Sequence, residues 1–345
     1  MNILLTGGLG YIGSHTAVEL LAHHNNVYIF DNLSNSDLSV IERIQKISGK
    51  KVSFVEGDLK DQCLLQSTLI ERKIEAVIHF AGSKSVNESV LMPIDYYDNN
   101  VVGTLSLLKA MQSSDVKTLI FSSSASVYGA SKYNPIDEEH SLEPVSPYAR
   151  TKKHIEEIML DLSASDDEWK FIFLRYFNPV GAHESGLIGE SPVGVPNNLM
   201  PYISQVAFGS LPYLSIYGDD YPTKDGTGVR DYIHVVDLAQ GHLAALSYLN
   251  TREKIKSPSI FNLGTGRGVS VLEMVAAFES ATGSKIPYEI KPRRLGDVAC
   301  CYADNSKAKK ILCWSAKKSL KDICDTTWRF QKNYAGIVGM DKDCE

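Results

Sequence analysis

Residues 2–13 read NILLTGGLGYIG, so an apolar run leads directly into a cluster of four glycines. Gly8, Gly10 and Gly13 fit the G-x-G-x-x-G pattern of dinucleotide-binding turns, and Gly7 with Gly10 and Gly13 fits its wider-spaced variant. Glycine suits such a turn because the bend is tight and backbone N–H groups must come close to a pyrophosphate. The apolar run before the glycines and the helical pattern after them predict a nucleotide-binding strand–turn–helix unit.

Short apolar runs and longer amphipathic stretches alternate through the first half of the chain. The apolar runs are rich in Val, Ile and Phe with little alternation, which is typical of parallel strands buried on both faces. The expected strands are Asn2–Thr6, Asn26–Asp31, Val52–Glu56, Ala76–Phe80, Thr118–Ser122 and Phe171–Tyr176, and the expected helices lie at about 12–24, 61–73, 95–113 and 146–162. Since parallel strands need crossover connections, this order predicts an α/β fold with a doubly wound parallel, Rossmann-type sheet.

The composition of the chain changes after residue 178, where Gly, Pro and Asn become frequent. The expected elements there are helices at Met200–Phe208, Val236–Leu249 and Ser270–Thr282 and a strand at Ile260–Leu263. We expect a dinucleotide-binding domain of residues 1–177 plus about 236–263. Residues 178–235 and 264–345 would then form a smaller, mixed α/β substrate lobe.

Composition excludes several classes of protein. With 43% hydrophobic and 22% charged residues among 345, the chain can form a globular core, and its formal net charge of -6 argues against a nucleic-acid partner. No apolar stretch reaches the roughly 18 residues of a membrane-spanning helix, and the N-terminus lacks the basic region of a signal peptide. Six cysteines without C-x-x-C spacing and scattered histidines predict reduced thiols, no metal site and a cytoplasmic location.

Asp31 ends the second expected strand, 18 residues after Gly13. A carboxylate at this place accepts hydrogen bonds from both ribose hydroxyls of an adenosine and repels a 2′-phosphate. Because residues 32–37 contain no arginine, the sequence favours NAD over NADP. Asp58, at the end of the third expected strand, is placed to reach the adenine edge. The alternative for both residues is an aspartate that only caps a turn.

Tyr148 and Lys152 are spaced to share one face of the helix that Ser146 and Pro147 introduce. A lysine cation beside a phenol lowers the phenol pKa, and an oxidised nicotinamide ring would lower it further. The pair therefore predicts a base that takes a hydroxyl proton while hydride leaves the same carbon. Ser124, at the carboxyl end of the fifth strand, can pass a hydrogen bond between substrate and Tyr148, which completes a catalytic Ser–Tyr–Lys set.

A second tyrosine–lysine pair with the same spacing, Tyr128 and Lys132, lies in a segment that contains Gly129 and Pro135. Side chains in such a loop need not meet. We therefore expect this pair to have no catalytic role.

With these residues identified, the sequence resembles the extended short-chain dehydrogenase/reductases, and within them the UDP-glucose 4-epimerase family. The glycine turn and the Ser–Tyr–Lys set carry the broader likeness, which runs from the N-terminus to about Trp328. The closer likeness rests on His79-Phe-Ala-Gly82, Tyr96-Tyr-Asp-Asn-Asn100, Phe121-Ser-Ser-Ser124, Arg175-Tyr-Phe-Asn-Pro-Val-Gly-Ala182, Pro196-Asn-Asn-Leu-Met-Pro201 and Asp225-Gly-Thr-Gly-Val-Arg-Asp-Tyr-Ile-His234. The segments at 175–182 and 225–234 are far more specific than the glycine turn.

The resemblance implies a tightly held NAD and a UDP-sugar substrate. The residues that it implies at the cofactor are Gly7, Gly10, Tyr11, Ile12, Gly13, Asp31, Asn32, Leu33, Ser34, Asn35, Ser36, Asp58, Leu59, Phe80, Ala81, Gly82, Lys84, Asn99, Ser124, Tyr148, Lys152 and Phe177. Those that it implies at the substrate are Lys84, Ser124, Tyr148, Asn178, Asn198, Leu199, Arg230, Arg294, Asp297 and Cys301. Arginines suit a diphosphate, whereas without the resemblance Arg294 is better interpreted as a surface residue in a solvated salt bridge.

The activity implied by the resemblance is reversible epimerisation at C4 of UDP-glucose and UDP-galactose. Hydride passes from C4 to NAD while Tyr148 takes the 4-hydroxyl proton, the 4-keto sugar turns over, and hydride returns to its other face. NAD is regenerated in each turnover and so acts as a bound group. The resemblance also implies a homodimer that pairs through the helices at about 95–113 and 146–162.

Two other functions agree less well with the sequence. A 4,6-dehydratase would resemble its relatives in a Thr-Asp-Glu at the end of the fifth strand, where this chain has Ser124-Ala125-Ser126. A non-catalytic NAD-binding sensor commonly lacks the tyrosine or the lysine, and this chain has both. A third alternative is a 4-epimerase that prefers UDP-N-acetylglucosamine or a UDP-uronic acid.

Cys301 bears on the choice of sugar. The resemblance aligns it with a position that is tyrosine in some epimerases and small in others. Because a thiol is much smaller than a phenol, our hypothesis is that an N-acetyl group fits beside C2 of the sugar, which would make UDP-GlcNAc and UDP-GalNAc substrates as well. The alternative is a filler thiol with no effect on selectivity.

Overall fold

The computed structural model describes residues 1–192, 196–251, 258–294 and 297–342. Within these residues, seven parallel strands form a central sheet in the order β11-β6-β5-β4-β1-β2-β3. Their bounds are β1 Asn2–Thr6, β2 Asn26–Asp31, β3 Ser53–Glu56, β4 Ala76–His79, β5 Thr118–Ser124, β6 Lys170–Tyr176 and β11 Ser259–Leu263. The strand order reverses between β1 and β4, and ligands of such sheets bind beyond the carboxyl ends at this point. The prediction of a doubly wound parallel sheet is confirmed.

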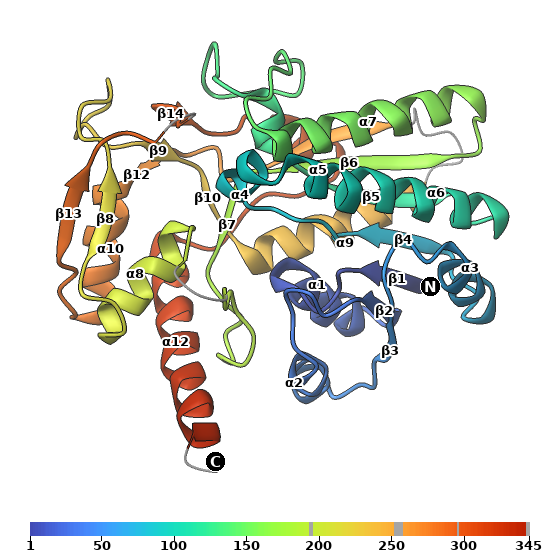
Figure 1. The fold of residues 1–345 in the computed structure, drawn as a ribbon, viewed down its shortest axis with the longest axis horizontal. Helices are drawn as coiled ribbons and strands as arrows, with labels where there is room; N and C mark the ends of the chain where they lie inside the picture. The colour runs from blue at the N-terminus through green and yellow to red at the C-terminus, as the bar shows by residue number, and fades with distance from the viewer. Residues whose placement is uncertain (193–195, 252–257, 295–296, 343–345) are drawn as a thin grey trace.

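Helices cover both faces of this sheet, as Figure 1 shows for α6 and α7 on one side and α1 and α9 on the other. Successive residues of a strand face opposite sides, so Ile3 and Leu5 pack with α1, α2 and α9, whereas Leu4 packs with α3, α6 and α7. The bounds of these helices are α1 Tyr11–Ala22, α2 Ser39–Ser48, α3 Gln62–Glu71, α6 Gly103–Ser113, α7 Pro147–Ser165 and α9 Val235–Thr251. The two cores on either face explain why the strands are apolar throughout.

The helix expected over 95–113 is present, but its winding is not uniform: α5 Pro93–Tyr96, a π-helix η1 Tyr97–Val102 and α6 follow one another without a gap. A further short helix, α4 Val86–Leu91, precedes them. The side chain of Asn100, in η1, accepts from Ser83 N at 2.7 Å and donates to Ser83 O and to Thr151 Oγ1, each at 3.0 Å. The π-helical turn therefore lies where hydrogen bonds of Asn100 connect the loop after β4 to α7. Such turns often occur at functional sites.

A second lobe follows β6 and lies beside the sheet, at the left of Figure 1. Its strands are β7 Asn178–Val180, β8 Leu214–Tyr217, β9 Val229–Arg230, β10 Tyr232–His234, β12 Val269–Ser270, β13 Tyr288–Lys291 and β14 Cys300–Cys301, and its helices are α8 Leu199–Phe208, α10 Val271–Thr282 and α12 Leu320–Lys342. The short helix α11 Ser306–Ile311 instead packs against the main sheet, where Ala308 joins the core beside β11. Met200, Ile203, Met274, Phe278 and Ile323 form a core that joins α8, α10 and α12. The chain returns to the main sheet between these segments, through α9 and β11.

Among the described residues, no helix combines the length and the apolarity needed to cross a membrane. The thiols of Cys63, Cys300, Cys301, Cys313 and Cys324 are free, while Cys344 lies outside the described residues.

Candidate active site

The glycine turn packs closely against the loop that follows β4. Gly7 has a positive φ of 67°, and a Cβ on it would lie 2.7 Å from the backbone nitrogen of Ala81. A Cβ on Gly13 would lie 2.6 Å from the carbonyl oxygen of Gly7, inside the turn itself. A Cβ on Gly10 would meet one atom within 4 Å, Gly7 O at 3.3 Å, so the outer side of Gly10 is open. Gly7 and Gly13 are therefore required by the protein's own packing, and Gly10 leaves room for a ligand.

Gly10 is also the N-cap of α1, and no side chain of the described residues caps this helix end by a hydrogen bond. The first backbone N–H groups of a helix have no partner inside the helix, and the helix dipole places positive charge there. This end of α1, with Tyr11 and Ile12 in its first turn, is therefore suited to a pyrophosphate.

Asp31 lies at the end of β2 with its carboxylate fixed by three donors. Oδ2 accepts from Leu9 N at 3.0 Å, and Oδ1 accepts from Leu33 N at 3.0 Å and from Ser36 Oγ at 2.9 Å. Asp58 follows β3, and its Oδ2 accepts from Asn32 Nδ2 at 3.0 Å, which ties the loops after β2 and β3 together. The loop residues predicted for the adenosine end thus share one edge of the sheet.

The Ser–Tyr–Lys set meets where β5 ends and α7 begins. Ser124 is the last residue of β5, and its Oγ accepts from Ser126 Oγ at 2.9 Å, so its own proton is left for another acceptor. The hydroxyl of Tyr148 is hydrogen-bonded to the Ser124 side chain. Lys152 lies one turn further along α7 and donates to Ser122 O at 2.7 Å, with 5% of the residue exposed. All three side chains therefore lie at the carboxyl end of β5.

The electrostatics of Tyr148 differ from the prediction. Burial raises the pKa of Tyr148 above its usual value, and the hydrogen bond from Ser124 and the charge of Lys84 lower it in part. Burial also lowers the pKa of Lys152 to about 8, against the opposing charge of Glu156. In the protein alone Lys152 donates to Ser122 O, and the cation whose charge lowers the Tyr148 pKa is Lys84. The effect of Lys152 on Tyr148 stays a prediction.

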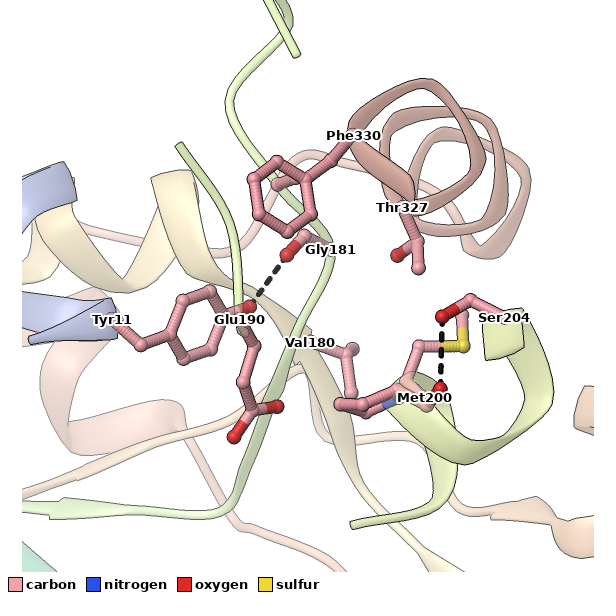
Figure 2. A pocket seen from close by; sticks show the side chains of 10 residues that line it. Tyr11, Val180, Gly181, Glu190, Met200, Ser204, Thr327 and Phe330 are labelled. Carbon is pink, nitrogen blue, oxygen red and sulfur yellow. Dashed lines mark hydrogen bonds between the residues drawn. The ribbon is translucent and has the colours of Figure 1, made fainter. Parts of the chain in front are cut away.

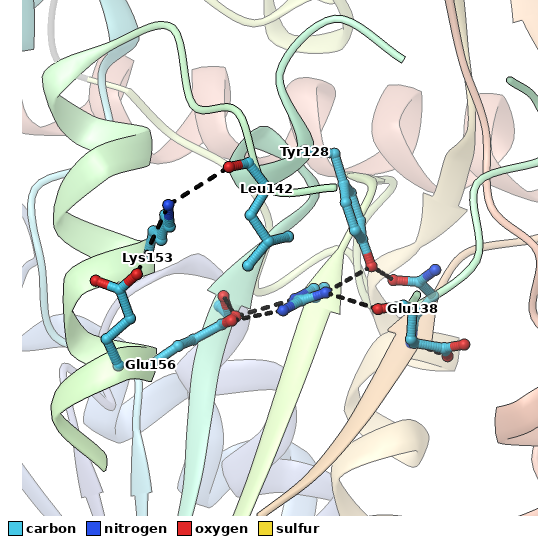
Figure 3. A network of polar contacts seen from close by, with 9 residues as sticks. Tyr128, Glu138, Leu142, Lys153 and Glu156 are labelled. Atoms are coloured by element: carbon cyan, nitrogen blue, oxygen red, sulfur yellow. Dashed lines mark hydrogen bonds and ion pairs between the residues drawn. The ribbon is translucent and has the colours of Figure 1, made fainter. Parts of the chain in front are cut away.

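A buried polar network underlies this catalytic helix (Figure 3), and sequence reasoning missed it. Arg175 on β6 donates from Nε to Glu156 Oε1 at 3.1 Å and from Nη2 to Oε2 at 2.6 Å. Ser123 Oγ donates to the same Glu156 Oε1 at 2.5 Å, and Arg175 Nη1 donates to Tyr128 Oη at 3.0 Å. Tyr128 in turn donates to Asn262 Oδ1 on β11 at 2.6 Å. The network joins α7 to three strands of the sheet.

The same network accounts for the second tyrosine–lysine pair. Tyr128 is fully buried within it, whereas Lys132 pairs with Glu143 at 2.5 Å on the surface. The two side chains therefore have different partners and do not form a site.

A second missed chain of hydrogen bonds crosses the sheet from β1 to η1. Thr6 Oγ1 and His79 Nδ1 are 2.6 Å apart, His79 Nε2 and Thr104 Oγ1 are 2.9 Å apart, and Thr104 donates to Asn100 O at 2.6 Å. Burial, helped by the charge of Lys152, lowers the pKa of His79 to about 3. His79 is thus a neutral, structural link, and Asn100 carries the chain on to Thr151 of α7.

Three of the residues predicted for the substrate, Arg230, Asp297 and Cys301, lie on or near β9 and β14. Cys301 on β14 is in register with Arg230 on β9, and Arg230 lies 3.9 Å from Asp297. Cys301 packs against the cluster that contains Ala125 and Phe177, beside the end of β5. Burial raises the pKa of Cys301 to about 11, so this residue is a thiol and presents no negative charge.

Arg294 and Asn178, two more residues predicted for the substrate, lie near β8 and β7 respectively. The guanidinium carbon of Arg294 lies 3.7 Å from the centre of the Tyr217 ring, and Arg294 O accepts from Asp297 N at 3.2 Å. Asn178 begins β7, and its backbone N–H donates to Asp231 O at 2.9 Å. An arginine fixed by stacking on a ring is better ordered than the solvated surface arginine considered from the sequence.

A pocket lies between the glycine turn and the second lobe (Figure 2). Tyr11 at the start of α1 donates to Gly181 O at 2.6 Å, and Glu190 lines the pocket beside it. Met200 on α8 and Phe330 on α12 close the other side. Tyr11 therefore joins the two lobes directly.

Lys84 and Asn198 approach each other across this boundary. Lys84 follows β4 in the main sheet, and Asn198 is the N-cap of α8 in the second lobe, next to Leu199. Glu190 contacts both of them, and no motif in the sequence pointed to Glu190. Its place depends on how the long segment after β7 folds back over Tyr11, which residue type and spacing do not reveal.

Comparisons with known proteins agree with this geometry. A family model described as GDP-mannose 4,6 dehydratase matches residues 4–327. A UDP-glucose 4-epimerase of Bacillus subtilis (strain 168) is 53% identical over 336 residues, which cover 96% of this chain and 97% of that protein. The crystal structure of a UDP-glucose-4-epimerase from Stenotrophomonas maltophila with bound NAD and formylated UDP-arabinopyranose is 50% identical, with a TM-score of 0.95 over 98% of this chain and 99% of that one. A UDP-glucose 4-epimerase from Bifidobacterium longum in complex with NAD+ and UDP is also 50% identical, with a TM-score of 0.93 over 96% and 98% of the two chains.

Proposed function

The chain belongs to the UDP-glucose 4-epimerase family of extended short-chain dehydrogenase/reductases, and on this premise we propose how its own residues carry out the reaction. The enzyme is an NAD-dependent isomerase that interconverts UDP-glucose and UDP-galactose through a 4-keto sugar. One observation carries the assignment of roles: the structure brings Ser124 at the end of β5 together with Tyr148 and Lys152 at the start of α7.

The glycine turn, the start of α1 and the end of β2 together form a site suited to NAD. The N-terminus of α1 has no side-chain cap, the outer side of Gly10 is open, and Asp31 offers a fixed carboxylate for ribose hydroxyls. When it is bound, NAD takes up the hydride from C4 of the sugar and gives it back. We assign the binding of NAD to residues 1–177 with about 236–263, and the binding of UDP-sugar to residues 178–235 and 264–345.

Tyr148 is the acid and base of the reaction in this proposal. Its phenol oxygen takes the 4-hydroxyl proton of the sugar and returns it after the keto sugar has turned over. Ser124 bridges the substrate oxygen and Tyr148, since its hydroxyl can donate while it accepts from Ser126. The positive charge of Lys84 favours the phenolate form of Tyr148, the form that can accept a proton, by lowering the Tyr148 pKa against the effect of burial. Lys152, one turn from Tyr148, supplies a buried cation.

A dehydratase is the alternative that the family model's description raises. Elimination of water needs an acid and a base at C5 and C6 of the sugar. The residues after β5 here are Ala125 and Ser126, within the 3-10 helix Ala125–Tyr128, and neither carries a carboxylate. The similar proteins at about half identity are epimerases, which favours epimerisation.

Cys301 favours a wider range of sugars as a second candidate function. Its thiol packs beside Ala125 and Phe177, close to the end of β5, where a tyrosine would fill more of the space. We propose that UDP-GlcNAc and UDP-GalNAc are epimerised as well as the plain hexoses.

We also propose a homodimer that forms through α6 and α7. A groove lies between these helices, and Leu105, Ile158 and Leu162 in it are only partly buried. The groove is lined by Leu105, Leu108, Lys109, Gln112, Ile158, Asp161, Leu162 and Ser165. A second copy that laid its own α6 and α7 against this surface would bury the apolar side chains of the groove.

The free thiols of the described cysteines support the proposal of a cytoplasmic location.

The assigned function is tested by incubating the purified protein with UDP-galactose and no added NAD. Formation of UDP-glucose, followed with a coupled dehydrogenase, supports both the activity and a resident cofactor. No product even with NAD supplied would contradict the assignment and leave the N-acetylated or acidic UDP-sugars to be tried.

A further inference from the structure

Glu190 connects the two lobes through a single carboxylate oxygen. Its Oε1 accepts from Lys84 Nζ at 3.0 Å and from Asn198 Nδ2 at 2.7 Å. The Glu190 side chain is 9% exposed, whereas that of Lys84 is 54% exposed. The carboxylate is therefore a nearly buried acceptor between a cation of the main sheet and an amide of the second lobe.

This contact constrains how Lys84 and Asn198 can face a ligand. A carboxylate only accepts hydrogen bonds, so the NH2 end of the Asn198 amide must point to Glu190 and its carbonyl oxygen must point elsewhere. An ammonium has three N–H donors and an amide has two, so each group keeps a donor after bonding Glu190. Glu190 thus fixes the orientation of both groups without using up their capacity to bind a substrate.

We propose that Glu190 is a positioning residue for UDP-sugar binding, which holds Lys84 and Asn198 in place across the boundary between the lobes. This inference rests on the proposed function, because Lys84 and Asn198 are assigned to the substrate there. Glu190 itself, as an anion, is not expected to touch the diphosphate.

The sign of the effect distinguishes positioning from simple electrostatics. If Glu190 acted only through its charge, Glu190→Gln would strengthen the binding of an anionic nucleotide, because one negative charge is removed. If Glu190 positions the two donors, Glu190→Gln weakens binding, since the amide oxygen that would face Lys84 and Asn198 carries no charge to hold the Lys84 ammonium. Glu190→Asp keeps the charge but is shorter by one methylene, so it also loses one of the two contacts.

The test measures the affinity of the holoenzyme for UDP by titration calorimetry, together with kcat and KM for UDP-galactose. We expect both variants to bind UDP about tenfold more weakly, as the loss of a hydrogen bond to a charged group predicts, with kcat changed by less than about threefold. Combined with Asn198→Ala, the Glu190→Gln change should add less than its full loss, because the contact with Asn198 is already gone and only the contact with Lys84 is left to lose. Glu143→Gln is the matched control, since Glu143 also pairs with a lysine, Lys132, on the surface.

Unchanged or tighter UDP binding in both variants would overturn the proposal, and so would full additivity with Asn198→Ala. Loss of folded protein in both variants, seen by circular dichroism, would assign Glu190 a structural role and overturn it as well. Failure of the proposed function would look different, because the wild-type enzyme itself would then fail to bind UDP or to turn over UDP-galactose.

Discussion

Arg175 holds both carboxylate oxygens of Glu156, at 3.1 Å and 2.6 Å, in a pair whose side chains are each 2% exposed. Glu156 lies one turn after Lys152 on α7, and Arg175 lies near the carboxyl end of β6, the strand beside the edge strand β11. The pair therefore anchors the helix that carries Tyr148 and Lys152 to the strand that leads to Phe177. Its removal should affect the stability of the fold and, through α7, the site.

Glu156→Gln should lower the free energy of unfolding by about 3–5 kcal/mol, because it leaves the buried Arg175 guanidinium without a counter-charge. Urea unfolding at neutral pH measures this loss. Asp325→Asn, which breaks the exposed pair of Lys321 and Asp325, is the control and should cost less than about 1 kcal/mol. A loss as small as the control's in Glu156→Gln would show that the pair does not anchor α7.

Tyr148→Phe should lower kcat for UDP-galactose by at least about 100-fold, because the proton acceptor is removed while the ring stays. Bound NAD, measured after denaturing the protein, should be unchanged in amount. Ser124→Ala should have a smaller effect in the same direction. A Tyr148→Phe enzyme with nearly normal kcat would rule out Tyr148 as the acid and base.

His79 should make the protein less stable as the pH falls. Its pKa is lowered to about 3 by burial, so below about 6.5 the unfolded chain binds a proton that the folded protein does not, and stability is lost on acidification. For this residue the loss between pH 7 and pH 5 is about 2 kcal/mol. The measurement compares unfolding free energies at these two pH values in the wild type and in His79→Gln, where the pH-dependent loss should shrink by that amount. An equal loss in both proteins would contradict the assignment.

Gly7→Ala and Gly49→Ala separate the backbone cost from the packing cost at the glycine turn. Both glycines have a φ of 67°, but a Cβ on Gly49 meets nothing within 4 Å, whereas one on Gly7 lies 2.7 Å from Ala81 N. Gly49→Ala should cost about 1–2 kcal/mol of stability, the usual penalty for alanine in this conformation. Gly7→Ala should cost more than Gly49→Ala and also release NAD. Equal stability and full NAD content in the two variants would contradict a tight turn.

Cys301→Tyr should remove activity on UDP-GalNAc and preserve activity on UDP-galactose, because the larger ring takes the space assigned to the N-acetyl group. The ratio of kcat/KM for the two sugars measures the effect, and Cys300→Tyr at the neighbouring position is the control. If the variant lost or kept both activities equally, Cys301 would be a filler thiol without influence on selectivity.

The sheet and its ligand-binding edge were predictable because buried parallel strands have short, continuous apolar sequences. Thr118–Ser124 shows this well, since an apolar run ends in three serines at the edge where ligands bind. The π-helical turn at Tyr97–Val102 was not predictable, because the contacts of Asn100 with Ser83 and Thr151 that accompany it arise only in the folded chain. The short strands of the second lobe, such as Cys300–Cys301, are too short to show a periodic pattern.

The electrostatics of the site depended on directions that spacing does not give. The spacing of Tyr148 and Lys152 correctly indicated one helix, yet the lysine side chain turns to Ser122 O, and Lys84 from a different strand end acts on the phenol. The pair of Arg175 and Glu156 likewise arises only when α7 packs on β6. Which charged side chains lie next to each other depends on how two packed elements direct their side chains, and the spacing of residues in the sequence does not give this.

The most direct test of the account uses UDP-galactose labelled with deuterium at C4 of the sugar, in ordinary water. The account predicts UDP-glucose that keeps the deuterium at C4, because the hydrogen leaves as hydride and returns from inside the site, while only the hydroxyl proton passes through Tyr148. Product in which the C4 deuterium has been replaced by hydrogen from water would show that C4 is inverted by proton exchange, and would contradict the account.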